Sequence, residues 1–265
     1  MITRKIRSVI PFLKYRFGAR SMFKVHSPFV YEFYTEVILD KNSRSTYDAI
    51  EKQRRSLLRQ RSLLETTDFG TGSGKNEYKV RFRQVKNVTR HSSISPKCGK
   101  LIHRLVEFNK PDDVLEIGTA MGISSLYIAT AAPKSNFVTM EGCAMIAEKA
   151  MENFNSFGIN NIELAMGNFD LLLEKTLIKF DKLDFVLVDG NHRREPTIEY
   201  FRLILPKLHE GSMVIIDDIH WSKGMEQAWN EIRANEKVSV SIDLFRTGIL
   251  LFKKDIAKEN FILKF

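Results

Sequence analysis

Acidic residues recur where apolar runs of this chain end, and two histidines follow closely. The acids are Glu116, Glu141, Asp189, Asp217 and Asp218, and the histidines are His192 and His220. Carboxylates can accept hydrogen bonds from a ligand or hold a hard divalent cation. An imidazole titrates near neutral pH and can take a proton. These residue types therefore predict ligand binding and base chemistry at the ends of strands.

The elements that must position these residues alternate regularly from residue 113 onward. Apolar runs predict strands over residues 113–116, 136–141, 162–165, 183–189, 211–218, 238–243 and 248–252. Helices are expected between them, over residues 123–129, 145–157, 196–208 and 224–235. Strand and helix in alternation predict an α/β, doubly wound and mostly parallel sheet. In such a sheet, ligands bind beyond the carboxyl ends of the strands.

The first strand leads into a glycine turn, Glu116-x-Gly118-x-x-x-Gly122. A dinucleotide fingerprint needs G-x-G-x-x-G, and its middle glycine is missing here. The spacing instead resembles the first motif of class I S-adenosylmethionine (SAM) methyltransferases, in which the acid and the turn hold the amino acid end of SAM. Glu141 lies 23 residues after Gly118, where a carboxylate can accept both ribose hydroxyls.

This resemblance covers residues 111–253 and implies the fold and the cofactor site. It implies a Rossmann-like, seven-stranded sheet whose last strand is antiparallel, preceded by a helical N-terminal extension. The segment 167–169 would surround the adenine. The implied SAM-binding residues are Glu116, Gly118, Thr119, Ala120, Met121, Gly122, Ser124, Ser125, Glu141, Gly142, Gly167, Asn168, Phe169 and Asp189.

The acids at the ends of the fourth and fifth predicted strands resemble a metal triad. An aspartate followed by an Asp-Asp or Asp-Asn pair is typical of cation-dependent O-methyltransferases of the catechol and macrocin sugar types. The resemblance implies that Asp189, Asp217 and Asp218 hold a divalent cation, with Mg²⁺ favoured by hard oxygen ligands. The chain departs from both types, because Asn191 and His192 stand where those enzymes have a lysine or a second acid.

The replacement of those residues by Asn191 and His192 suggests a candidate general base. His192 is the candidate general base, with Asp189 beside it in the catalytic set, and His220 is the second candidate for base or ligand. The alternative for His192 is a loop histidine that bonds only the backbone.

The front of the chain differs from the rest in charge. Residues 1–110 carry 24 Lys/Arg against 9 Asp/Glu, whereas residues 111–265 carry 17 against 23. Residues 1–24 mix basic and apolar residues, which suits an anionic membrane surface, nucleic acid, or an arm packed on the domain. We expect helices over residues 27–39, 47–64 and, in two pieces, 81–106. The glycine-rich loop 68–75 lacks a preceding apolar strand and does not have P-loop spacing.

These patterns predict two domains, a basic helical extension over residues 1–110 and a SAM-binding domain over 111–265. No apolar run is long enough to span a bilayer, and no signal peptide is recognised. Cys98 and Cys143 form no metal pattern. We therefore expect a cytoplasmic protein, with a peripheral position at the inner membrane surface as the alternative and the oligomeric state open.

Three functions compete at this point. The first is a metal-assisted O-methyltransferase acting on a small molecule, a sugar or a lipid-linked glycan. The second is an RNA or protein methyltransferase that binds its substrate through the basic front half. The third is a SAM-binding protein without turnover, which clustered carboxylates disfavour.

Overall fold

The described part of the chain falls into two compact units. The computed structural model describes residues 12–21, 25–68, 79–254 and 256–265. The central unit comprises Lys41–Asp181, and the terminal unit combines Met1–Asp40 with Lys182–Phe265. The predicted division near residue 110 was drawn from charge and resemblance, and it stays a prediction.

The core of the central unit consists of parallel strands, each followed by a helix. The strands lie side by side in chain order, with Glu116 opposite Thr139 and Glu141 opposite Met166. These strands are β3 (Asp113–Ile117), β4 (Asn136–Glu141) and β5 (Ile162–Met166). The helices after them are α6 (Ile123–Ala131), α7 (Ala144–Ser156) and α8 (Phe169–Leu177). Strands covered on both faces give nearly continuous apolar runs, so the sequence located β3 and β4 well.

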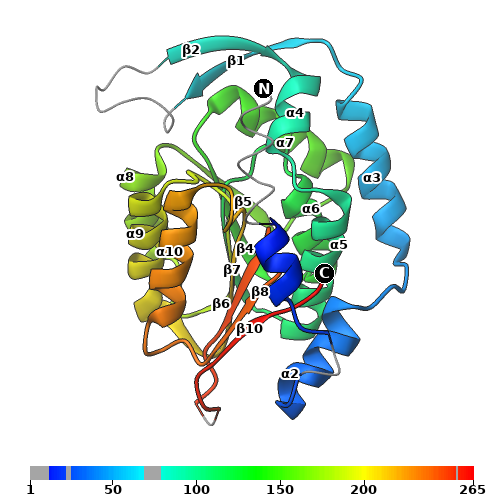
Figure 1. Cartoon of the computed structure of the whole chain (residues 1–265). Helices are drawn as coiled ribbons and strands as arrows, with labels where there is room; N and C mark the ends of the chain where they lie inside the picture. Colours follow the sequence, from blue (N-terminus) through cyan, green and yellow to red (C-terminus); the bar gives the residue numbers. More distant parts are fainter. Residues whose placement is uncertain (1–11, 22–24, 69–78, 255) are drawn as a thin grey trace. The chain divides into compact units, whose positions relative to one another are not determined.

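The segment that precedes β3 differs from the helices expected from the sequence. Its elements are α3 (Ser45–Leu57), β1 (Leu63–Asp68), β2 (Lys79–Gln84), α4 (Val85–Ser92) and α5 (Pro96–Asn109). The expected helix over 47–64 ends early, and an antiparallel hairpin of β1 and β2 stands where no strand was expected, beside α4 and α7 (Figure 1). Thr66 pairs with Arg81 and is buried, as is Leu64. Polar strands such as β1 and β2 are stabilised by pairing with each other, and amino-acid composition alone does not reveal that pairing. Apart from Asp68, the predicted loop 68–75 lies outside the described residues.

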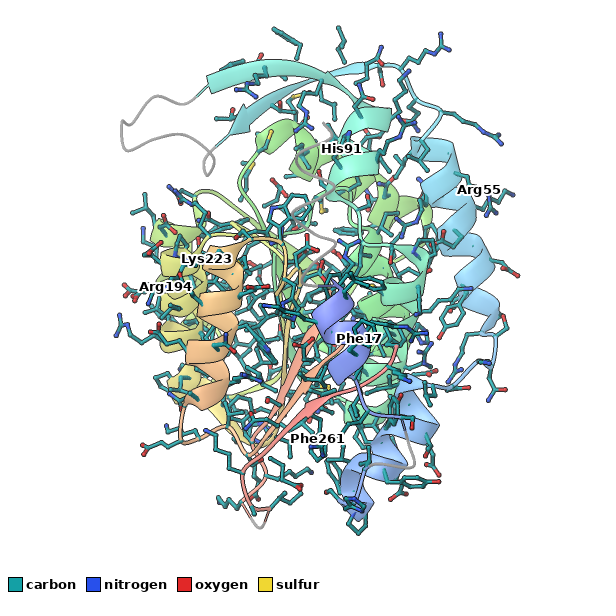
Figure 2. All side chains as sticks on the ribbon, viewed as in Figure 1. Phe17, Arg55, His91, Arg194, Lys223 and Phe261 are labelled. Atoms are coloured by element: carbon teal, nitrogen blue, oxygen red, sulfur yellow. The ribbon has the colours of Figure 1, made fainter. Side chains whose placement is uncertain are left out.

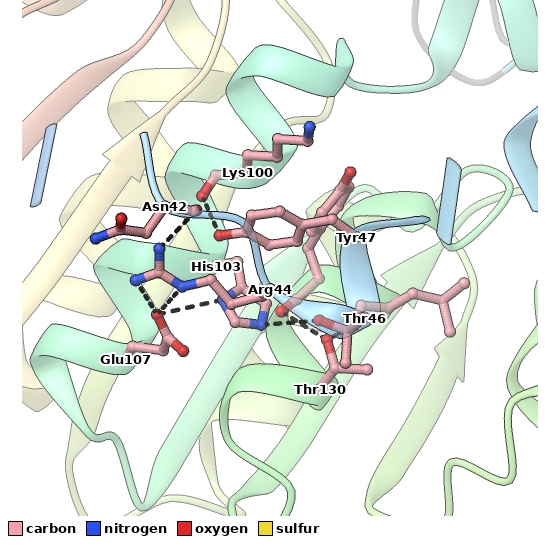
Figure 3. Close-up of polar contacts among 10 residues, drawn as sticks. Asn42, Arg44, Thr46, Tyr47, Lys100, His103, Glu107 and Thr130 are labelled. Atoms are coloured by element: carbon pink, nitrogen blue, oxygen red, sulfur yellow. Dashed lines mark hydrogen bonds and ion pairs between the residues drawn. The ribbon is translucent and has the colours of Figure 1, made fainter. Parts of the chain in front are cut away.

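A partly buried polar cluster joins the beginning of α3 to α5 (Figure 3). The Arg44 guanidinium lies 3.1 and 3.0 Å from Glu107 Oε2, and His103 Nδ1 lies 3.5 Å from the same oxygen. Burial lowers the pKa of His103, and the charge of Glu107 offsets part of that effect. The cluster fixes the basic helix α3 to the domain, while Arg55 on the same helix is exposed (Figure 2).

The terminal unit contains the remaining strands, in the order β10-β8-β9-β7-β6. They are β6 (Leu183–Val188), β7 (Leu208–Ile216), β8 (Val240–Asp243), β9 (Gly248–Leu251) and β10 (Glu259–Ile262). β6 and β7 are parallel, and β9 is antiparallel to both β7 and β8, as expected for the closing hairpin. The expectation that this antiparallel strand ends the sheet is wrong, because β10 follows it and pairs parallel to β8. β10 is short and half exposed, so its apolar signal is weak.

Helices complete the terminal unit at both ends of the chain. After β6 come α9 (Arg194–Ile204), the 3₁₀ turn η3 (Leu205–Lys207) and α10 (Lys223–Ala234). Arg194 and Lys223 lie at the beginnings of the neighbouring helices α9 and α10 (Figure 2). Near the N-terminus, residues 12–18 are helical, followed by α2 (Pro28–Phe33) and the π-helix η2 (Tyr34–Ile38).

The two ends of the chain contact each other within this unit. The Tyr15 hydroxyl donates to the carbonyl of Leu263 at 2.6 Å, and the Tyr34 hydroxyl donates to that of Lys264 at 2.7 Å. Phe17 is 86% exposed, so the described part of the basic arm is partly packed and partly open. Residues 1–11 and 22–24 of the predicted membrane-binding segment lie outside the described residues, and that role stays a prediction.

The architecture confirms the predicted α/β class, with a mostly parallel sheet, antiparallel pairing near the end and helices at the N-terminus. Among the described residues, no helix has the length and apolar character needed to cross a membrane.

Candidate functional site

Glu116 is the penultimate residue of β3, and its carboxylate is buried in the protein interior. Its Oε2 accepts hydrogen bonds from the hydroxyls of Ser125 and Thr139, the latter at 2.6 Å. Its Oε1 is buried and has no hydrogen-bond partner among the described residues. Burial raises the pKa of Glu116, and the hydroxyls of Ser124, Ser125 and Thr139 offset part of that effect. An unused buried acceptor is costly unless a ligand satisfies it.

The glycine turn after β3 depends on backbone conformations that favour glycine. Gly118, Ala120 and Gly122 have φ of 109°, 46° and 74°. The backbone N–H groups of Gly118 and Thr119 both donate to the carbonyl of Met140 at 3.0 Å. A Cβ on Gly122 would lie 2.5 Å from the Phe154 ring, so this glycine also permits α7 to pack closely. The turn is therefore fixed before any ligand arrives.

Asn153 on α7 also supports the turn, and the sequence analysis missed it. Its Nδ2 donates to the carbonyl of Met121 at 2.8 Å, and its Oδ1 accepts from Gln53 at 2.7 Å. It is 2% exposed. The sequence does contain a signal for this role, because Asn153 is a polar residue within the apolar stripe of a helix.

Glu141 ends β4 and is held by backbone donors. Its Oε2 accepts from the N–H of Ala120 and its Oε1 from the N–H of Cys143, each at 2.9 Å. Burial raises the pKa of Glu141, and these N–H groups, together with that of Gly142, offset part of that effect. A carboxylate has about four acceptor positions, so Glu141 retains capacity for a ligand hydroxyl. This geometry suits a ribose diol.

The third segment of the predicted cofactor site follows β5. Gly167 donates its N–H to the carbonyl of Glu141 at 2.9 Å, and Asn168 caps α8 by accepting from the N–H of Asp170 at 3.0 Å. Phe169 is the first residue of α8. The central unit thus contains every predicted SAM-binding residue except Asp189, at the ends of three adjacent strands.

Asp189 and the Asp217–Asp218 pair belong to the terminal unit, at the ends of β6 and β7. The N–H of Asp217 donates to the carbonyl of Val188 at 3.0 Å, which brings the two strand ends together. Asp217 is 4% exposed, and Thr247 Oγ1 lies 3.3 Å from its Oδ1. Burial, and then the charge of Asp218, raise the pKa of Asp217 to about 7.

Arg246 contributes a positive charge that the sequence analysis did not anticipate. Its Nε and Nη2 donate to Asp218 Oδ1 at 3.0 and 2.8 Å, and its Nη2 lies 3.9 Å from Asp217 Oδ2. Arg246 lies in the turn between β8 and β9, 28 residues after Asp218. Nothing local in the sequence indicates this pairing, because the antiparallel β7–β9 contact creates it.

His192 lies beside Asp189, with its Nε2 3.8 Å from Asp189 Oδ1. Burial lowers its pKa, the charge of Asp218 raises it, and that of Arg246 lowers it again, with a net lowering. The side chain is therefore neutral near pH 7 and can accept a proton. The preceding turn is held by Asn191, which has φ of 55° and donates to the Tyr200 hydroxyl at 3.1 Å.

His220 has both ring nitrogens engaged by carboxylates. Its Nδ1 lies 3.1 Å from Glu226 Oε1 and its Nε2 lies 2.8 Å from Asp243 Oδ2. Burial lowers its pKa, but the carboxylates of Asp243 and Glu226 outweigh burial and raise it overall. A protonated imidazole with two acceptors is suited to holding structure, so the geometry favours His192 over His220 as the base.

The three predicted metal ligands do not form a cation site as the side chains stand. Within the described ranges, no group of three or more His, Cys, Asp or Glu side chains has an arrangement that could hold a metal ion. The reason is visible at Asp218, whose Oδ1 already accepts two N–H groups of Arg246. The donor set therefore does not fit a bound divalent cation.

Comparisons with known proteins show that parts of the chain are similar to methyltransferases. Residues 115–219 match a family model described as a methyltransferase domain. The O-methyltransferase of Bacillus cereus in complex with S-adenosylhomocysteine (SAH) superposes with a TM-score of 0.56 at 19% identity, over 84% of this chain and 96% of that one. TomG of Streptomyces achromogenes, an O-methyltransferase of tomaymycin synthesis in complex with SAM, superposes with a TM-score of 0.56 at 19% identity. This match covers 85% of this chain and 95% of that one. The fold is thus the Rossmann-like fold of SAM-dependent methyltransferases.

Two curated proteins with similar sequences are both methyltransferases. A catechol O-methyltransferase of Niastella koreensis is 26% identical over 130 residues, 48% of this chain and 58% of that protein. A tRNA (guanine-N(7)-)-methyltransferase of Mycoplasma mobile is 28% identical over 95 residues, 36% of this chain and 46% of that protein. The matches thus span about half the length of these curated relatives. Over the matched part of its length, the chain is thus similar to SAM-dependent methyltransferases, including one of the catechol O-methyltransferase type.

Proposed function

We propose that this protein transfers the methyl group of SAM to a hydroxyl oxygen of a small molecule. The observation that carries the proposal is Glu116, a buried carboxylate with one oxygen left without a partner beside a preformed glycine turn. An ammonium group is the ligand that satisfies such an oxygen best, and SAM has one at its amino acid end. Glu141 supports the proposal, because it is held by neutral backbone donors and retains acceptor capacity for a ribose hydroxyl.

When bound, SAM supplies an electrophilic methyl group on a sulfonium. The chain's own residues then need to hold the cofactor and activate the acceptor. In the central unit, Glu116 and the turn residues bind the amino acid end, Glu141 binds the ribose, and the segment 167–169 borders the adenine. The acceptor oxygen forms a bond to the methyl carbon as the carbon–sulfur bond breaks, which leaves SAH.

The terminal unit supplies the proton acceptor. His192 takes the hydroxyl proton, since the lowered pKa keeps its imidazole neutral. Asp189 beside Nε2 then stabilises the imidazolium that forms. No step is assigned to a divalent cation, because Arg246 engages the acids that would hold it. Sugars, lipid-linked glycans and catechols are all hydroxylated acceptors compatible with this chemistry.

The test is calorimetric titration of SAM and SAH into the wild type and Glu116→Gln, with Glu163→Gln as the matched control. Glu163 is also a strand carboxylate of the central unit, but it is exposed. We expect both ligands to bind the wild type and the control, and Glu116→Gln to weaken binding by about tenfold, the worth of one charged hydrogen bond. Absence of binding to the wild type would refute the assignment. Tritiated SAM with a panel of phenols, sugars and glycolipids would then identify the acceptor.

A second candidate, methylation of RNA, is favoured by the tRNA-modifying relative and by exposed arginines. Arg55 on α3 and Arg81 and Arg83 on β2 are exposed in the central unit. Phosphate contacts of this kind bind RNA in a strongly salt-dependent manner. Filter binding of bulk tRNA at physiological salt, followed by assay of methyl incorporation, separates this candidate from the first.

A further inference from the structure

The turn that carries Arg246 is held firmly on several sides. The N–H of Leu244 donates to the carbonyl of Thr247 at 3.0 Å, and the N–H of Phe245 donates to Asp243 Oδ1 at 2.8 Å. The carbonyl of Arg246 accepts from the N–H of Ile219 at 3.1 Å, which ties the turn to the residue directly after Asp218. The guanidinium is thus aimed at the Asp217–Asp218 pair by the backbone as well as by charge.

Aromatic rings clamp the same turn. The Phe245 ring lies 5.1 Å from that of Phe12, 5.3 Å from that of Tyr15 and 5.3 Å from that of His220. His220 is in turn fixed by Asp243 and Glu226. These contacts fix the backbone from which the Arg246 side chain starts, so the Arg246–Asp218 contact costs less entropy than a pair on mobile loops.

Charge at the cluster can be balanced in one of two ways. Adjacent aspartates with little solvent access repel each other unless a cation lies between them. A divalent ion would need their oxygens as ligands, whereas Arg246 uses them as hydrogen-bond acceptors, and Asp218 Oδ1 already accepts two of its N–H groups. The guanidinium is also within 3.9 Å of Asp217. The two cations therefore compete for the same oxygens.

We propose that Arg246 is a built-in counter-ion for Asp217 and Asp218, in the role that the catechol type gives to a divalent cation. The acid cluster of this chain then does not take up Mg²⁺, and it becomes a divalent-cation site when Arg246 is removed. The inference concerns charge balance in the terminal unit and is independent of whether the chain transfers methyl groups.

The experiment is calorimetric titration of MnCl₂ and MgCl₂ into the cofactor-free wild type, Arg246→Ala and Arg246→Ala/Asp218→Asn. Arg202→Ala is the matched control, since Arg202 donates to Glu199 at 2.8 and 2.6 Å on the exposed face of α9. We expect Arg246→Ala to bind one ion at least about tenfold more tightly than the wild type. The control should behave as the wild type, and the double variant should lose the gain.

Thermal unfolding with and without MnCl₂ gives a second measurement that also reports whether each variant is folded. The ion should raise the Tm of Arg246→Ala selectively, because a ligand stabilises only the protein that binds it. Arg246→Gln serves in the same assays if alanine unfolds the turn. Binding of one ion to the wild type that Asp217→Asn abolishes would overturn the proposal. Equal, weak binding by the wild type and both Arg246 variants would overturn it as well.

Failure of this proposal and failure of the proposed function are distinguishable. The ion titrations contain no SAM, and the SAM and SAH titrations contain no added metal. If the protein binds SAM and also binds Mg²⁺ through Asp217, the counter-ion proposal alone is wrong. If it binds neither SAM nor SAH while Arg246→Ala gains an ion site, the proposed function alone is wrong.

Discussion

Glu141 in the central unit and Asp218 in the terminal unit both lie at the carboxyl ends of parallel strands, yet their partners differ in kind. Glu141 is held by backbone N–H groups, and Glu116 beside it by hydroxyls. Asp218 is held by a guanidinium. Neutral donors leave a carboxylate's charge available to a ligand, whereas an ion pair largely neutralises it. The central unit is therefore prepared to bind a charged or hydroxylated ligand, and the terminal unit to hold its own charges in balance.

The largest expected effect is a loss of kcat on substitution of His192, the proposed general base in the terminal unit. His192→Gln should lower kcat by about 100-fold or more, the usual contribution of a positioned base, and should leave SAH affinity unchanged. The acid limb of the wild-type kcat profile should lie below the ordinary histidine pKa, since burial lowers that of His192. Steady-state kinetics between pH 5 and 9 and SAH calorimetry check both points. A parallel loss of SAH binding would instead place His192 in the cofactor site.

Glu141→Ala tests the central unit, and here we expect the affinity for SAH to fall. Because we propose that Glu141 binds the ribose, its removal should weaken SAH binding by about 100-fold, within the range for loss of a hydrogen bond to a charged group. Glu148→Ala, an exposed acid on α7, is the control and should bind as the wild type does. If Glu141→Ala retains wild-type affinity, the ribose assignment is wrong.

Gly122→Ala separates packing of the glycine turn from its conformation. The new Cβ would lie 2.5 Å from Phe154 at φ of 74°, so we expect a loss of about 2–3 kcal/mol in the free energy of unfolding. Gly158→Ala has a similar φ of 65° with no atom within 4 Å, and it should cost only about 1 kcal/mol. Urea unfolding measures both. Equal losses would show that the Phe154 contact is unimportant.

The smallest effect concerns the charge balance of the terminal unit and depends on pH. The folded-state pKa of His220 lies above its unfolded value of about 6.5. Its stabilisation is thus fully present below pH 6.5 and is lost as pH rises through the folded-state value. His220→Gln should therefore cost about 1 kcal/mol at pH 6 and less at pH 9. His91→Gln, exposed on α4, is the control, and a loss that does not vary with pH would contradict the charged pairing.

The sequence predicted the parts of the fold that have a local signal. β3, β4 and β6 are apolar runs that end at an acid, so both the strands and the positions of Glu116, Glu141 and Asp189 could be inferred. The hairpin of β1 and β2 has no such signal, because the buried Leu64 and Thr66 alternate with the exposed Leu63 and Glu65, so apolar and polar residues occur on both faces. Arg246 escaped notice because a strand pairing, rather than sequence spacing, brings it to Asp218.

The terminal unit has a consequence for how the protein is made. Its strands come late in the chain, yet Tyr15 and Tyr34 from the first 40 residues bond the carbonyls of Leu263 and Lys264. The central unit is continuous in sequence and can fold while synthesis proceeds, since domains generally fold as units during translation. The terminal unit must wait until Leu263 and Lys264 have left the ribosome. The turn that holds Arg246 against Asp218, clamped by Phe12 and Tyr15, is thus among the last parts of the molecule to form.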